Sequence, residues 1–192
     1  MNKGIVIFGL NGAGKSTLAH ALAMKLCYRE MDVEDYYFPQ QRESRMRSME
    51  GMGDESHGGI PFAVSRTQEE VQRALIGDMN AAQGFVLACV NLKWDDEIIR
   101  HIDLAVRLTA PLDERLARIE ARETRRFGDR VLPGGDMYAS QAEFRRMVAG
   151  RDESTLDANE KRLNCPVLRL DGRVPVDENV ARIIDYMENR SV

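Results

Sequence analysis

The feature that most constrains the fold of this 192-residue chain is a glycine-rich segment near its amino terminus. Residues 9–17 read GLNGAGKST, which has the Walker A spacing G-x-x-x-x-G-K-S, and they directly follow the apolar run 5–8. Glycines let successive backbone N–H groups converge on phosphate oxygens, and a helix that begins behind the loop adds its positive end. The segment therefore predicts a strand, a phosphate-binding loop and a helix start, and we expect the chain to bind ATP or GTP.

The residues of this loop have separate expected roles toward a triphosphate. Lys15 is expected to bridge the β- and γ-phosphates, and the Ser16 hydroxyl to bind the Mg²⁺ that the nucleotide carries. Thr17 is expected to make a lesser contact near the α-phosphate. The other nucleotide-binding positions of the loop are Gly9, Asn11, Gly12, Ala13 and Gly14.

Composition limits what else the chain can be. With 43% hydrophobic residues it can bury one sizeable core, which favours a single domain over residues 1–192. A formal charge of −4 argues against nucleic acid or an anionic membrane as the main partner. No apolar run approaches the roughly twenty residues of a membrane-spanning helix. Three isolated cysteines, an odd count without a C-x-x-C pair, favour a cytoplasmic location.

Short apolar runs alternate with helical patterns along the chain. Strands are expected at residues 5–8, 28–33, 85–90, 104–108 and 167–170. Because such runs separated by helices are typical of buried parallel strands, the sequence predicts an α/β protein. The expected architecture is a three-layer α/β/α P-loop NTPase fold with a five-stranded parallel sheet. Two regions rich in glycine and arginine, 36–65 and 124–151, are expected to be flap insertions, the first for the acceptor and the second a lid.

The helix expected after Pro111 carries arginines along one edge. At about 100° per residue, Leu112, Leu116 and Ile119 share one stripe. Beside it gather Arg115, Arg118, Arg122, Arg125 and Arg126. Two interpretations stay open, a solvated charged face or an edge that binds an anion.

On these residues the chain resembles the nucleoside-monophosphate-kinase-like group of P-loop kinases, which includes adenylate, shikimate and gluconate kinases. The segment 118–122, RIEAR, is similar to the R-I-x-x-R that precedes the lid in that group. The resemblance implies that Arg118 stacks on adenine and that Arg122 reaches the transferring phosphate. It also implies that Arg126 and Arg130 swing in when the lid closes.

The segment 171–176, DGRVPV, is similar to the turn that lines the adenine pocket in the same group. The resemblance implies backbone contacts to adenine from Gly172 to Val176, with Pro175 between them. Together with Arg118, this turn favours ATP over GTP.

Three carboxylates follow the second expected strand, namely Asp32, Glu34 and Asp35. A hydroxyl acceptor profits from a carboxylate that orients it and takes its proton, whereas a phosphate acceptor needs no base. The cluster resembles the D-x-D of shikimate and gluconate kinases, which implies that Asp32 holds Mg²⁺ through water. Asp35 is favoured as the base and Glu34 is left open, while a solvated acidic turn is the alternative.

The arginines that flank the first insertion bear on the acceptor. They suit a carboxylate or phosphate on it, although solvated charge is equally open, and they are Arg42, Arg45, Arg47 and Arg66. The sequence thus predicts an enzyme that uses ATP and Mg²⁺ to phosphorylate a hydroxyl of a small, potentially anionic metabolite. A nucleoside or nucleotide kinase is the alternative within that class. A P-loop ATPase or a nucleotide-binding regulatory module is the alternative from another class.

Overall fold

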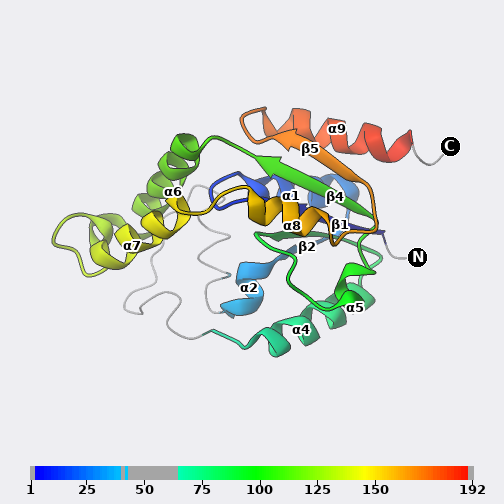
Figure 1. Cartoon of the computed structure of the whole chain (residues 1–192), viewed down its shortest axis with the longest axis horizontal. Helices are drawn as coiled ribbons and strands as arrows, with labels where there is room; N and C mark the ends of the chain where they lie inside the picture. Colours follow the sequence, from blue (N-terminus) through cyan, green and yellow to red (C-terminus); the bar gives the residue numbers. More distant parts are fainter. Residues whose placement is uncertain (1–2, 40–41, 43–64, 190–192) are drawn as a thin grey trace.

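A five-stranded parallel sheet forms the centre of the computed structural model, which describes residues 3–39, 42 and 65–189 (Figure 1). The strand order is β2-β3-β1-β4-β5, and every neighbouring pair is parallel. The strands are β1 (Lys3–Phe8), β2 (Arg29–Asp32), β3 (Gly84–Cys89), β4 (Leu104–Thr109) and β5 (Val167–Asp171). The predicted α/β fold and its parallel sheet are confirmed.

Helices cover both faces of this sheet, because successive side chains of a strand point to opposite sides. Ile5 and Ile7 of β1 belong to the core beneath α1 (Lys15–Leu26) and α9 (Val176–Glu188). Val6 and Phe8 belong to the core on the other face. The helices over that second face are α4 (Gln68–Ala81), α5 (Asp96–Ile99) and α8 (Ser154–Glu160).

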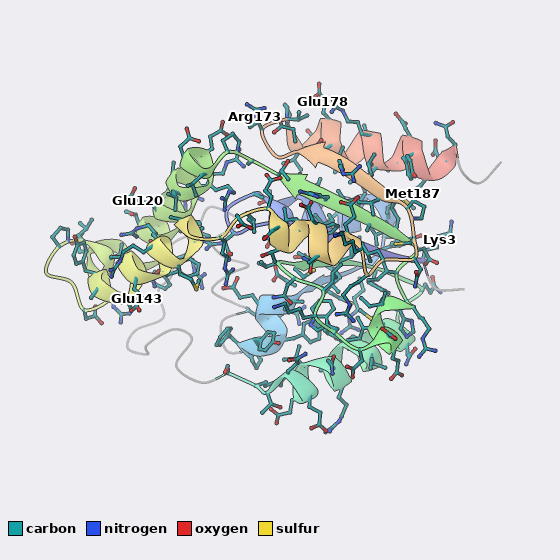
Figure 2. The ribbon with its side chains drawn as sticks, viewed as in Figure 1. Lys3, Glu120, Glu143, Arg173, Glu178 and Met187 are labelled. Atoms are coloured by element: carbon teal, nitrogen blue, oxygen red, sulfur yellow. The ribbon has the colours of Figure 1, made fainter. Side chains whose placement is uncertain are left out.

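A helical arm projects from the carboxyl edge of the sheet (Figure 1). It consists of α6 (Leu112–Phe127), a 3₁₀ turn at Gly128–Val131 and α7 (Tyr138–Ala149). The arm has a small core of its own, formed by Phe127, Val131 and Met137, and an ion pair between Glu123 and Arg145 joins α6 to α7. Glu120 and Glu143 lie on this arm, away from the sheet (Figure 2). The region predicted as the lid is therefore largely helical.

The buried face of α6 differs from the predicted stripe. Leu112 is 41% exposed, whereas Arg115 and Arg126 are buried beside Ile119. Leu112 lines a cavity at the start of α6 together with Leu10 and Leu170. The inner face of α6 packs against the phosphate-binding loop and α7.

A buried arginine attaches α8 to the sheet. Arg107 of β4 is 8% exposed and donates hydrogen bonds to Glu153, Asp157 and Glu160 at 3.0, 2.6 and 3.1 Å. Such charge-assisted bonds offset the cost of burying the guanidinium. In the part of the chain that the structure describes, no helix combines the length and apolar character needed to span a membrane.

The first predicted insertion lies mostly outside the described residues, and Arg45 and Arg47 lie there with it. Its expected beginning, residues 36–37, belongs to the short helix α2 (Val33–Tyr37). Arg42 and Arg66 are both exposed.

Candidate active site

The carboxyl ends of all five strands meet at one edge of the sheet, where ligands bind in open α/β proteins. The glycine-rich loop follows β1, Asp32 ends β2, and Asp171 ends β5. The topology therefore brings together three segments that are far apart in the chain, and each of them carries predicted site residues.

The glycines of the loop hold a backbone shape that other residues would strain. Gly12 and Gly14 have φ angles of 83° and 101°, and Gly14 is the N-cap of α1. A Cβ on Gly12 would lie 2.4 Å from the backbone oxygen of Arg115 in α6. The predicted segment thus forms a compact loop from Gly9 to Gly14 and the first turn of α1, an arrangement that is suited to binding an anion.

Lys15 is buried at the start of α1. Its Nζ donates to the backbone oxygen of Leu10 at 3.1 Å, so the ammonium lies over the loop. Burial lowers the pKa of Lys15 to about 8, and the neighbouring Asp32 opposes that shift. A partly desolvated ammonium of this kind is suited to bind phosphate oxygens.

Ser16 and Asp32 are in direct contact. The Ser16 hydroxyl donates to Asp32 Oδ2 at 2.5 Å, and Asp32 Oδ1 accepts from the backbone N–H of Glu34 at 3.0 Å. Asp32 is therefore both the N-cap of α2 and a neighbour of the loop. A hydroxyl and a carboxylate are hard oxygen donors, so the pair fits a magnesium ion that is also held by phosphates.

The two remaining carboxylates of the cluster have different surroundings. Burial raises the pKa of Glu34, and the positive charges of Arg122, Arg126 and Lys15 oppose this effect. The Asp35 side chain is 9% exposed, and its Oδ2 lies 3.9 Å from Arg42 Nε. Glu34 thus shares the charge environment of the phosphate loop, while Asp35 lies near an arginine of the predicted acceptor region.

Helix α2, which carries both carboxylates, is fixed to α4 by a polar contact that sequence reasoning missed. The Tyr36 hydroxyl donates to Asp78 Oδ2 at 2.6 Å, and Arg29 pairs with the same carboxylate at 2.8 Å. Burial and this hydrogen bond raise the pKa of the Tyr36 phenol. Tyr36 and Asp78 are 42 positions apart, so no local sequence pattern predicts their contact.

The predicted adenine turn lies against the phosphate loop, and Arg118 joins the two. Arg118 donates to the backbone oxygens of Ala13 and Gly172 at 3.4 and 3.1 Å. Pro175 is the N-cap of α9, and Val176 is its first residue. Arg173 lies at this turn (Figure 2), paired with Asp171 at 2.7 Å. The structure thus brings the predicted adenine-binding residues together.

The predicted lid arginines lie at different distances from the loop. Arg122 is half-buried, and its charge acts on both Lys15 and Glu34. Arg126 is 6% exposed, and its guanidinium lies 5.0 Å from the ring centre of Phe127. Arg130 is paired with Asp136 at 2.8 Å within the arm. Arg122 is therefore beside the loop in this structure, whereas Arg130 is held by the arm.

Two further arginines contact the phosphate loop at Asn11, and the sequence did not predict these contacts. Arg115 donates to the Asn11 backbone oxygen at 3.2 Å, and Arg151 donates to its side-chain oxygen at 2.6 Å. Arg115 belongs to the arginine edge of α6, but its position beneath the loop follows from the path of the helix. Arg151 carries no motif that distinguishes it from other arginines.

Comparison with known proteins places the chain among kinases in fold. No family model matches the sequence. The chain is 28% identical, over 98% of its own length and 99% of the other, to the uncharacterized protein YqaC of Bacillus subtilis. It is 32% identical to a probable gluconokinase of Rattus norvegicus, but this match covers only 46% of the chain and 44% of the gluconokinase.

Two solved structures extend over nearly the whole chain. A sugar kinase from Janibacter sp. HTCC2649 has a TM-score of 0.55 at 20% identity, covering 98% of this chain and 95% of the other. Shikimate kinase from Bacteroides thetaiotaomicron has a TM-score of 0.57 at 17% identity, covering 97% and 98%. The predicted resemblance to P-loop kinases is confirmed at the level of the fold.

Proposed function

We propose that this protein is a kinase that transfers the γ-phosphoryl group of ATP to a hydroxyl of a small metabolite. The observation that carries the proposal is the contact of Ser16 with Asp32 beside Lys15, with Glu34 and Asp35 on the next turn. This arrangement unites a triphosphate cradle with carboxylates that can receive a hydroxyl proton. The three free cysteines fit the cytoplasmic location that we propose for it.

The donor half of the reaction depends on positioning and charge neutralisation. The loop amides and Lys15 would hold the phosphates, and Arg118 would lie against the adenine with the turn at Gly172. Ser16 and Asp32 would hold the Mg²⁺, which neutralises charge on the phosphate oxygens.

The acceptor half depends on the carboxylates of α2. Asp35 is our proposed proton acceptor. Glu34 is the alternative, which is supported by the electrostatic effect of Lys15 and Arg122 on its carboxylate. The relatives and structural neighbours include proteins named gluconokinase and shikimate kinase, so we propose hydroxy acids as the first acceptor class to test. Arg42, paired with Asp35, is available to bind an acidic group.

The arm formed by α6 and α7 is the proposed lid. Its closure would bring Arg126 toward the phosphates beside Arg122, and it would exclude water that otherwise hydrolyses ATP. The separate core of the arm fits a segment that moves as one unit.

An ADP-release assay over a panel of acceptors tests the proposal. The panel holds sugars, sugar acids, other hydroxy acids, amino alcohols, nucleosides and nucleoside monophosphates, with the Lys15→Ala variant as the blank. We expect one hydroxyl class to stimulate ADP release from the wild type only. Stimulation by nucleosides or their monophosphates alone would establish the nucleotide-kinase alternative, and acceptor-independent release would establish an ATPase.

A further inference from the structure

An open groove of about 590 Å³ lies on the arm, between α6 and α7 (Figure 1). Four apolar residues form its floor, and they are Leu116, Ala117, Ala142 and Ala149. Leu116 and Ala142 are half-buried, whereas Ala117 and Ala149 are exposed. The two helices therefore present a shallow apolar surface, most of it made by small side chains.

The charged residues along this groove are separated by helix. Asp113 and Glu120 come from α6, and Arg145 and Arg146 come from α7. The charge of Arg145 is neutralised by Glu123. Asp113, Glu120 and Arg146 form no ion pair with any residue that the structure describes. One rim of the groove thus carries unpaired negative charge, and the opposite rim carries unpaired positive charge.

A second copy of the same groove complements both rims. When a two-fold axis runs along the groove, α6 of one copy lies over α7 of the other, and the acidic rim faces the basic rim. When the axis runs across the groove, α6 lies over α6, and like charges oppose each other at a cost in free energy. Because Glu123 contacts Arg145, Glu120 and Arg146 lie within about one helical turn of the same height. The charges therefore favour the first arrangement.

We propose that a second copy of this chain docks on the groove, so that the arms of two copies pair as a symmetric four-helix bundle. In this dimer Glu120 pairs with the partner's Arg146, and the alanines of the floor let the helices approach closely. Burial of the floor supplies affinity, while the charged rims fix the orientation. None of the residues predicted to bind nucleotide or acceptor lines the groove, so the dimer does not rest on the proposed function.

Sedimentation equilibrium of the full chain tests the dimer. The groove extends over residues 113–120 and 142–149, each about 12 Å of helix, so the interface is small and the dimer is weak. We expect a dissociation constant of about 100 µM. A reductant is present throughout, because the exposed Cys27 would otherwise cross-link two copies. A chain that remains monomeric at about 0.5 mM overturns the proposal.

Ala117→Glu places a longer, charged side chain on the floor of the groove and should weaken the dimer by at least about tenfold. Ala121→Glu is the matched control, because Ala121 is exposed on the same helix and does not line the groove. It should change the dissociation constant by less than about twofold. Equal losses overturn the proposal. A lower thermal stability of the monomer in Ala117→Glu alone also overturns it, because another segment of the same chain then covers the groove.

Charge reversal tests the orientation of the two copies. Glu120→Arg and Arg146→Glu should each weaken the dimer by about tenfold, because two-fold symmetry repeats every altered contact. The double variant Glu120→Arg with Arg146→Glu restores opposite charges across the interface, and its dissociation constant should return to within about twofold of the wild-type value. A double variant that dimerises no better than the single ones overturns the arrangement of α6 over the partner's α7.

Discussion

The positions of single residues in the phosphate loop were predictable because they follow from local spacing. Lys15 and Ser16 lie where the motif requires them, and Asp32 meets Ser16 because parallel strands end at one edge. The support of Asn11 was not predictable in this way. Its partners Arg115 and Arg151 are 104 and 140 positions away, and only the folded path of the chain brings them there.

Nucleotide binding should depend on pH through Lys15. Burial lowers its pKa to about 8 in the free protein, and bound phosphates should raise it. Binding then takes up a proton above that pH, so ATP affinity should fall by up to about tenfold per pH unit as the pH rises past 8. Calorimetry in buffers of different ionisation enthalpy measures both the affinity and the proton uptake.

Lys15→Arg is the matched control for this experiment, because arginine stays protonated throughout. Its ATP affinity should not follow the same pH dependence. Proton uptake of equal size in both proteins would assign the titration to another group.

The choice between the two α2 carboxylates is open to kinetic measurement. Asp35→Asn should lower kcat by about a hundredfold, the lower range for loss of a general base, with little change in the KM for ATP. Glu34→Gln should affect the KM for ATP as well, since Glu34 lies in the charge environment of Lys15 and Arg122. A large loss of kcat in Glu34→Gln alone would make Glu34 the base.

At the scale of elements, four of the five strands were predictable from their apolar runs, and β1, β3 and β4 are buried on both faces. The weakest signal belongs to β2, whose sequence REMD is not apolar and whose first residues are partly exposed. Helix α2 was missed because it has only five residues, too few for a periodic pattern. The exposure of Leu112 on α6 was not predictable, because periodicity tells which side chains share a face, whereas what that face packs against depends on the rest of the molecule.

The contact between α2 and α4 should position the proposed catalytic carboxylates. Tyr36→Phe and Asp78→Ala each remove the hydrogen bond at 2.6 Å, so kcat should fall while the KM for ATP changes little. Each should also lower the free energy of unfolding by about 1 kcal/mol.

Thr67→Ala is the stability control, since it removes the cap of the same helix α4 at a similar cost of about 1 kcal/mol and lies away from Asp78. Its kcat should remain that of the wild type. An equal loss of kcat in Thr67→Ala would show that the α2–α4 contact acts only through stability and does not position the carboxylates.

The attachment of α8 should be visible in equilibrium unfolding. Arg107→Met removes three charge-assisted hydrogen bonds and should lower the free energy of unfolding by about 2 kcal/mol. Arg169→Met removes an exposed pair with the same helix and should cost less than about 1 kcal/mol. Urea titration of both variants checks the difference, and similar costs would contradict the role of Arg107.

At the scale of the whole molecule, alternation of strands and helices predicted the layers, whereas the strand order came only from the structure. Right-handed crossovers permit several orders of five parallel strands, so the pattern alone does not select one. The arm was likewise not predictable from local patterns. It has a core of its own, formed by Phe127, Val131 and Met137, which is separate from the two cores that cover the sheet.

Closure of the arm should shorten the distance between it and α4. Spin labels at Glu143 on α7 and Glu69 on α4, with Cys27 and Cys165 replaced by serine, report that distance by electron–electron resonance. We expect it to shorten when a non-hydrolysable ATP analogue and Mg²⁺ are added. Labels at Glu120 and Glu143, both on the arm, should show no change (Figure 2). A constant distance from α4 would contradict the lid proposal.

The bridge from Arg118 to Ala13 and Gly172 has a consequence for anyone who builds chimaeras of this protein. If the glycine-rich segment of another protein replaced residues 9–17 alone, the new loop would face the original turn after β5. The Arg118 guanidinium would then no longer bridge two segments that fit each other. The phosphate loop, α6 and the turn after β5 form one structural unit. Only their joint exchange should yield a hybrid that retains nucleotide affinity.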